Sequence, residues 1–198
     1  MPTKKIYAKW LRFTEEDNAL DYLEKASFHI SQTEKDKKSW KWVILSLHGA
    51  LYGFAICAIK GTNPDRVTYT TKEGKVKLIS FDDALNRCQD HQWMWIYGHS
   101  KTLVLTNNQK WSIDKLKKEF RNKFEHYQPV AWSIEIHGMP QIAIHVLDVI
   151  RFLAIDSGNI FSSSQNKQRK IKSLIFQSKK FLKRTKLYKE YLIANQEK

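Results

Sequence analysis

Three residues with the potential for acid–base and phosphate chemistry lie close together in one segment that is predicted to be helical. Arg121, Asn122 and His126 fall within about one and a half helical turns. An imidazole titrates near neutral pH, so it can take the proton of a ribose 2′-hydroxyl or protonate a 5′-oxygen leaving group. A guanidinium is permanently charged and can stabilise the negative charge of a phosphorane. With Asn122 to orient the imidazole or a phosphate oxygen, this set predicts RNA cleavage without a metal ion.

The helix expected to carry these residues is indicated by its apolar spacing. Apolar side chains recur every three or four positions and form one stripe: Ile113, Leu116, Phe120, Phe124 and Tyr127. We expect Ser112 to be the N-cap and Pro129 to follow the end of the helix. At about 100° per residue, Asn122 and His126 lie opposite the stripe, and Arg121 lies at its flank. The motif is therefore expected to face solvent, a cleft or a partner subunit.

An ordinary explanation of part of this pattern is a surface ion pair. Arg121 and Glu125 are spaced i,i+4, as in many exposed helical ion pairs. An Arg and a His at one such spacing arise by chance in roughly one in five chains of average composition. The Asn that follows the Arg, the helical setting and the exposed face favour the functional interpretation.

This helix resembles the signature helix of the HEPN superfamily (higher eukaryotes and prokaryotes nucleotide-binding domains). The family signature is an Arg, often followed by Asn, Asp or His, and then a His a few positions later. Arg121, Asn122 and His126 match it as Arg-x4-His, the shortest spacing. The position at which some toxin members carry a Tyr that an antitoxin modifies is Gln128 here, so the resemblance does not extend to that mode of control.

The resemblance implies a fold, an activity and partners. HEPN domains are α-helical bundles, usually dimeric, with the two Arg/His pairs meeting at the dimer interface. Many are metal-independent RNases that act as toxins or phage-defence effectors, and others have lost catalysis and only bind. For this chain it implies an endoribonuclease in which His126 is the general acid/base, Arg121 stabilises the transition state and Asn122 orients. The alternative is an inactive HEPN-type module that binds RNA or a partner protein such as an antitoxin or another defence component.

Composition favours a basic, intracellular, single-domain protein. The 198 residues are expected to form one domain, and the net charge of +14 suits a polyanionic partner such as RNA. Cys57 and Cys88 are far apart and form no Cys-x-x-Cys motif, which argues against a disulfide framework or a zinc site and fits the cytoplasm. No Gly-rich phosphate loop or metal-ligand spacing is present, so we expect no cofactor and no metal. A third possibility is a monomeric structural RNA- or DNA-binding protein in which the Arg/His spacing is accidental.

The segment from Trp42 to Ile59 is apolar enough to raise the question of a membrane. It carries no formally charged residue and approaches the length of a span. Ser46 and His48 interrupt it, and Lys41 and Lys60 stand at its ends. We expect a buried central helix of a bundle that does not enter a membrane, with Gly49 and Gly53 allowing close helix approach, for example at a dimer interface.

The remaining elements are predicted to build an all-α, HEPN-like helical bundle. Thr14 is expected to cap a helix that ends near Gln32, and Gly61 is expected to end the buried helix. Residues 66–79 alternate around Lys72-Glu73-Gly74, which predicts a small β-hairpin inserted between helices. Ser80 is expected to cap a helix that continues to about His99. Residues 132–137 are expected to be extended, and Pro140 is expected in the first turn of a helix through residue 155.

The last part of the chain, residues 163–198, is predicted to be one long basic helix. Basic residues outnumber acidic ones eleven to two in this segment. An apolar stripe would dock the helix, and its lysines would form a track for RNA phosphates. The residues predicted to contact RNA are Lys123 in the signature helix and, in the basic segment, Lys170, Lys172, Lys179, Lys180, Lys183 and Arg184.

Overall fold

The acidic stretch after Thr14 begins the first helix, α1 (Glu15–Gln32), as predicted. The Thr14 hydroxyl accepts a hydrogen bond from the Asp17 backbone N–H, and Glu15, Glu16 and Asp17 lie in the first turn, where the helix dipole favours acidic groups. In this computed structural model the described residues are 9–125, 131–160 and 164–196. They form a mostly helical fold with one two-stranded hairpin, which confirms the predicted all-α class with its hairpin insertion.

The most apolar segment forms α2 (Ser39–Lys60), the central helix. Gly61, with φ of 53°, ends it as predicted. A Cβ on Gly53 would lie 2.7 Å from the Ala19 Cβ, so this glycine permits the close approach of α1 within the chain. By length and composition α2 could cross a membrane, but 72% of its most apolar window is buried inside the fold, as in the core helix of a soluble protein.

After α2, a short 3-10 helix, η1 (Pro64–Val67), leads into the hairpin, and two helices follow the hairpin. Strand β1 (Thr68–Thr70) pairs antiparallel with β2 (Val76–Leu78), so the predicted hairpin is confirmed with shorter strands. Ser80 caps α3 (Phe81–Cys88) in a capping box with Asp83. The helix predicted to reach His99 is wrong in its extent: α3 ends at Cys88, and α4 (His91–Met94) starts again after the new cap Asp90.

The helix of the predicted motif begins earlier than Ser112. Thr106 and Gln109 form a capping box, so α5 spans Asn107–Asp114, and Ser112 lies buried inside it. The prediction that Ser112 caps this helix is therefore wrong. The chain continues as the π-helical segment η2 (Lys115–Arg121) and the short α6 (Asn122–Glu125).

Pro140 lies in the first turn of α7 (Met139–Arg151), as predicted, and the helix runs on into the π-helical segment η3 (Phe152–Asp156). The basic segment is α8 (Gln165–Leu182) followed by α9 (Lys186–Gln196).

The prediction of one long C-terminal helix is wrong because residues 183–185 interrupt the helix. There the buried Thr185 hydroxyl donates to the Leu182 carbonyl and accepts from the Tyr188 N–H, which starts a new helix.

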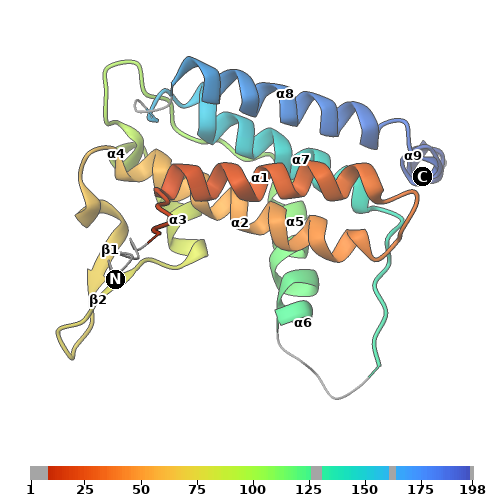
Figure 1. The fold of residues 1–198 in the computed structure, drawn as a ribbon, viewed down its shortest axis with the longest axis horizontal. Coiled ribbons are helices and arrows are strands. Elements are labelled where there is room, and N and C mark those ends of the chain that lie inside the picture. The colour runs from red at the N-terminus through yellow and green to blue at the C-terminus, as the bar shows by residue number, and fades with distance from the viewer. Residues whose placement is uncertain (1–8, 126–130, 161–163, 197–198) are drawn as a thin grey trace, which may run out of the picture.

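The buried described residues form one contiguous apolar core centred on α2. In Figure 1, α8 runs along the upper edge with α7 beneath it, α1 and α2 cross the middle, and α5, η2 and α6 descend to the lower edge. The hairpin projects at the left, and α9 turns away from α8 at the right. The predicted catalytic helix and the basic helix α8 therefore lie along different edges of the molecule.

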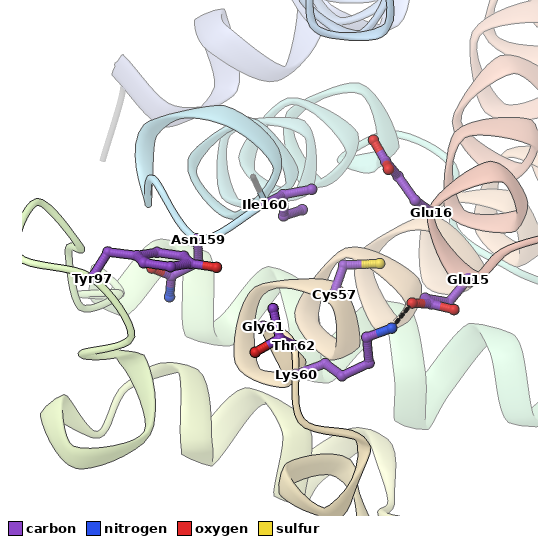
Figure 2. Close-up of a pocket in the computed structure, with 9 residues that line it drawn as sticks. All are labelled: Glu15, Glu16, Cys57, Lys60, Gly61, Thr62, Tyr97, Asn159 and Ile160. Carbon is purple, nitrogen blue, oxygen red and sulfur yellow. Dashed lines mark hydrogen bonds and ion pairs between the residues drawn. The ribbon is translucent and has the colours of Figure 1, made fainter. Parts of the chain in front are cut away.

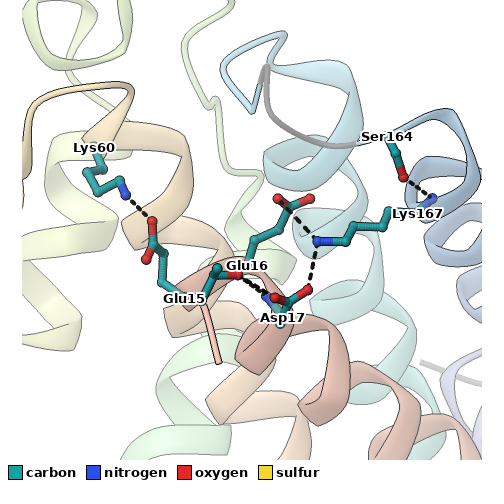
Figure 3. A network of polar contacts seen from close by, with 7 residues as sticks. Glu15, Glu16, Asp17, Lys60, Ser164 and Lys167 are labelled. Carbon is teal, nitrogen blue, oxygen red and sulfur yellow. Dashed lines mark hydrogen bonds and ion pairs between the residues drawn. The ribbon is translucent and has the colours of Figure 1, made fainter. Parts of the chain in front are cut away.

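Ion pairs fasten the start of α1 to two neighbouring helices, as Figure 3 shows. Lys167 of α8 lies 2.7 Å from Asp17 Oδ1 and 3.8 Å from Glu16 Oε2, and Lys60 of α2 pairs with Glu15. The hydrogen bonds from Lys167 and Thr14 hold the pKa of the Asp17 carboxyl down to about 2. Lys167 is thus committed to the fold rather than to an external anion.

Candidate functional site

The chain leaves α-helical geometry at the predicted motif. In η2 the hydrogen bonds run from residue i to i+5, and such π-helical turns are frequent at functional sites. Leu116 and Phe120 are buried, and Phe124 packs against the core, so the apolar stripe follows a spacing of four. Arg121 and Lys117 each follow a buried residue of the stripe by one position. The structure therefore places Arg121 at the flank of the stripe, as predicted.

The Arg121 side chain is partly buried and held by its own helix. It is 29% exposed, and its Nη2 lies 2.5 Å from Glu125 Oε2 in the i,i+4 ion pair expected from the sequence. Its Nη1 donates to Asn122 Oδ1 at 3.1 Å. Its Nε is buried and has no hydrogen-bond partner among the described residues. The Nε is therefore an unsatisfied buried donor that solvent does not reach, and a carboxylate compensates the charge of the guanidinium.

His48, which the sequence places in the most apolar helix, interacts electrostatically with the same guanidinium. The His48 ring stacks on Phe81, with centroids 4.4 Å apart. Burial, followed by the charges of Arg121 and Lys117, lowers the pKa of His48 to about 4, while the Asp82 carboxylate acts in the opposite direction. His48 is therefore neutral at pH 7. The sequence carries no signal for this proximity, because 73 positions separate His48 from Arg121 and no local pattern connects them.

The third predicted catalytic residue, His126, lies outside the described residues, as do Tyr127, Gln128 and Pro129. Asn122 is partly buried and accepts from Arg121. The structure thus joins two of the three predicted residues, Arg121 and Asn122, by a hydrogen bond, and the charges of Arg121, Lys117 and Asp82 all act on His48. Lys117 pairs with Asp82, so it is not a free cation.

Four of the six basic residues predicted on the C-terminal segment line a groove between α7 and α8. We call this the α8 groove, formed by Asp148, Arg151, Lys172, Ile175, Phe176, Lys179, Lys180 and Lys183. Lys179 pairs with Asp148, Arg151 lies 3.4 Å from Asp156, and outside the groove Lys170 lies 2.5 Å from Glu24. The four remaining predicted residues of the segment are exposed and have no carboxylate partner in the described part of the chain: Lys172, Lys180, Lys183 and Arg184. These four can meet phosphates without breaking an ion pair.

A small pocket lies where α1 begins and α2 ends, and Figure 2 shows the residues that line it. Its volume is about 130 Å³, below the range of typical ligand pockets. Glu15 is paired with Lys60, and burial raises the pKa of the Cys57 thiol to about 12, so this cysteine is not a nucleophile near neutral pH. The Asn159 amide donates to the Ala58 and Met94 carbonyls and joins three segments. These contacts stabilise the fold rather than perform chemistry.

A Ser–His pair joins α5 to α7. The Ser112 hydroxyl and His145 Nδ1 are 2.8 Å apart, and Gln141 Nε2 lies 2.6 Å from His145 Nε2. Ser112 is fully buried, so no substrate can reach its oxygen. Within the described ranges no group of three His, Cys, Asp or Glu side chains is placed to hold a metal ion.

In the comparisons with known proteins, no family model, no curated protein and no solved structure matches this chain. The likeness to the HEPN superfamily accordingly rests on the residues of the signature helix.

Proposed function

We propose that this protein is a metal-independent endoribonuclease of the HEPN type that cleaves RNA by attack of a 2′-hydroxyl. The observation that carries the proposal is the environment of Arg121. Its guanidinium is partly buried, is held in place by Glu125 and Asn122, and stands five positions before His126. A positioned cation is suited to stabilise the charge of a phosphorane.

In the proposed reaction the 2′-oxygen forms a bond to phosphorus while the bond from phosphorus to the 5′-oxygen breaks. A base takes the 2′-hydroxyl proton, and an acid protonates the departing 5′-oxygen. His126 serves in one of these roles, Arg121 neutralises the phosphorane and Asn122 holds the guanidinium through the hydrogen bond at 3.1 Å. The products are a 2′,3′-cyclic phosphate and a 5′-hydroxyl, and no water or metal enters the step.

The basic charge supports RNA as the substrate. The net charge is +14, and the exposed, unpaired cations of the α8 groove are suited to phosphates. The proposal includes a HEPN-like bundle, a cytoplasmic homodimer in which two Arg121 sites meet, and restraint by an antitoxin or another defence-system protein.

The test is cleavage of an end-labelled RNA pool in EDTA by the wild type and by Arg121→Ala and His126→Ala. We expect 2′,3′-cyclic phosphate ends from the wild type and a loss of rate of roughly 10²–10³-fold in each variant. His91→Ala, which removes an exposed imidazole at the start of α4, is the matched control and should cleave normally. Equal cleavage by the wild type and both site variants, or cleavage only with added Mg²⁺, would overturn the proposal.

A specific contact favours the alternative of a catalytically silent module that binds RNA or a partner protein. The Arg121–Glu125 ion pair offsets the charge that a phosphorane would require. Salt-sensitive RNA binding without cleavage by the wild type would establish this alternative.

A further inference from the structure

Aromatic rings from four separate chain segments meet on one surface next to the predicted motif. We call it the aromatic–lysine surface, formed by Phe28, His29, Lys41, Trp42, Lys123, Phe124 and Trp132. These residues come from α1, the start of α2, α6 and the irregular segment before α7. Phe28 is 60% exposed and Trp42 is 48% exposed, although large aromatic side chains usually bury most of their area.

The rings of this surface are close enough to form two clusters. His29 lies between Phe28, at 5.1 Å, and Trp42, at 6.0 Å and nearly parallel. Phe124 and Trp132 meet edge to face at 5.0 Å. These distances are typical of aromatic pairs, so the rings support one another and are held ready for another planar group.

Lysines lie over the same rings. The Lys41 ammonium is 5.0 Å from the Trp42 centroid and 5.8 Å from the Phe124 centroid, and it therefore bridges the two clusters of rings. The Lys123 ammonium is 5.8 Å from the Trp132 centroid. Neither lysine has an ion-pair partner in the described part of the chain. Their charges are placed by rings rather than by carboxylates, and they remain available to an anion.

A groove runs through this surface. Its volume is about 460 Å³, within the range of ligand pockets, and its described lining carries lysines but no carboxylate: Lys37, Lys38, Trp40, Lys41, Trp42, Phe124, Ile134 and Ile136. The Trp40 indole is buried, and its Nε1–H has no acceptor among the residues that the structure describes. An acceptor oxygen brought by a ligand would satisfy this donor.

From these observations we infer that the aromatic–lysine surface binds a single-stranded segment of RNA, with bases stacked on Trp42 and the neighbouring rings and phosphates at Lys37, Lys38, Lys41 and Lys123. Exposed rings interleaved with unpaired lysines are the combination that single-stranded nucleic acids require, because bases stack and the backbone is anionic. In a duplex the base faces are stacked on one another, so a duplex could make only the contacts between its phosphates and the lysines. The inference rests on the proposed function in taking RNA as the ligand.

The surface is continuous with the Arg121 site. Lys123 and Phe124 follow Arg121 and Asn122 directly in α6. On α2, Lys41 and His48 are seven residues apart, which is about two helical turns and about 10 Å along one face. Lys41 meets Phe124, while His48 lies near Arg121. A strand stacked on Trp42 is thus led toward the proposed reaction centre.

The test measures binding of a short fluorescein-labelled 2′-O-methyl oligouridylate, which stacks but has no free 2′-hydroxyl and so cannot be cleaved by the proposed route. A 2′-O-methyl duplex serves as the comparison ligand. We expect Trp42→Leu to weaken binding of the single strand about tenfold and to leave duplex binding unchanged, because one stacked base is lost. Trp95→Leu is the matched control, since Trp95 is similarly exposed (61%) at the end of α4, outside this surface. Thermal unfolding of each variant establishes that it is folded.

Separate results would overturn the inference and the proposed function. Single-strand binding that is insensitive to Trp42→Leu, or no binding by the wild type, overturns the inference even if the wild type cleaves RNA. Single-strand binding that depends on Trp42, without cleavage by the wild type, supports the inference and overturns the proposed nuclease. Light scattering on the same samples gives a third result: a dimer that Trp42→Leu dissociates would assign the groove to a second copy of the chain and overturn RNA as its occupant.

Discussion

The α8 groove and the aromatic–lysine surface are both basic, but they differ in how many of their cations are paired with carboxylates. In the α8 groove, Lys179 pairs with Asp148, and Arg151 with Asp156. On the aromatic–lysine surface, Lys41 and Lys123 lie over rings and have no carboxylate partner in the described ranges. The first region therefore presents a partly neutralised field with one exposed ring, Phe176, and the second presents free charge among several rings.

This difference indicates that net charge alone does not identify how a surface would recognise RNA. Phosphate contacts position a nucleic acid without regard to its bases, whereas rings require exposed base faces. We therefore expect the α8 groove to bind single and double strands alike and the aromatic–lysine surface to prefer single strands. The following predictions test this division.

The largest expected effect is the loss of the unpaired cations of the α8 groove in the triple variant Lys172→Gln, Lys180→Gln and Lys183→Gln. Each phosphate contact contributes about 0.7 to the salt slope for single strands, so the slope should fall by about 2, and affinity should fall about 100-fold near 0.1 M salt. Single and double strands should lose affinity to a similar extent. Fluorescence anisotropy across a salt series measures both quantities.

The control for this prediction carries the same change of charge on the hairpin: Lys72→Gln, Lys75→Gln and Lys77→Gln, all exposed. If the hairpin variant lost as much affinity as the α8 variant, binding would depend on total charge, and the α8 groove would have no distinct role. A loss confined to single strands would assign the α8 lysines to the same function as the aromatic–lysine surface.

The second prediction concerns the acid sensitivity of the region around Arg121. Burial and nearby cations lower the pKa of folded His48 from 6.5 to about 4, so the unfolded state binds more protons between these values. The contribution of His48 to stability is full above pH 6.5 and is lost as the pH falls toward 4. Between pH 8 and pH 5 the expected loss is about 2 kcal/mol. Urea unfolding at both pH values measures it.

His48→Phe is the matched variant, because it keeps a ring on Phe81 and removes the titrating group. Its unfolding free energy should change about 2 kcal/mol less between the two pH values than that of the wild type. In the other region, burial also lowers the pKa of His145, but the neighbouring Asp148 opposes this shift, so removing His145 should change the pH dependence less. A pH dependence that is the same in His48→Phe and wild type would contradict the assigned environment of His48.

The boundaries predicted correctly from the sequence depend on local chemistry. Thr14 and Ser80 each accept from a backbone N–H three residues ahead, and Gly61 adopts a positive φ, so each signal lies next to its effect. The prediction that Ser112 is the N-cap was wrong because another capping sequence, Thr106 to Gln109, precedes it and starts the helix about one and a half turns earlier. The turn at Thr185 was hidden because basic residues continue on both sides of it, and composition does not record where a helix changes direction.

The candidate site was only partly predictable for a different reason. The Arg121–Glu125 ion pair follows from i,i+4 spacing alone and could be anticipated. The proximity of His48 to Arg121, and of Trp42 to Phe124 through Lys41, joins segments more than 70 positions apart. The π-helical turn of η2 also has no signature in the local pattern, because the apolar spacing of four suits an α-helix as well. Such contacts arise from packing and need the folded structure.

The third prediction concerns the hydrogen bond between Ser112 of α5 and His145 of α7. Ser112 on α5, the helix that leads to Arg121, meets His145 on α7, one wall of the α8 groove. Ser112→Ala should cost about 1 kcal/mol of unfolding free energy, because it leaves His145 Nδ1 without its hydrogen-bond partner. Ser178→Ala is the control for deletion of a buried hydroxyl, since Ser178 bonds Ser27 and lies outside this connection. If α5 and α7 are coupled through this bond, hydrogen exchange in η2 should quicken in Ser112→Ala and not in Ser178→Ala.

The smallest expected effect arises from Glu125, the carboxylate that pairs with Arg121. In Glu125→Gln the side chain keeps its length but loses its charge, so the guanidinium would meet a phosphate without first leaving an ion pair. Exposed helical pairs contribute about 0.3–0.5 kcal/mol, and the Arg121 side chain is 29% exposed, so RNA affinity should rise only about twofold. Glu119→Gln removes the same charge at the Lys115 pair one turn and a half earlier and is the control. A gain in Glu125→Gln alone would indicate that Arg121 contacts phosphate. Equal gains in both variants would indicate a general effect of net charge, and the unpaired lysines of the aromatic–lysine surface would then be the better candidates for the anion contacts near the motif.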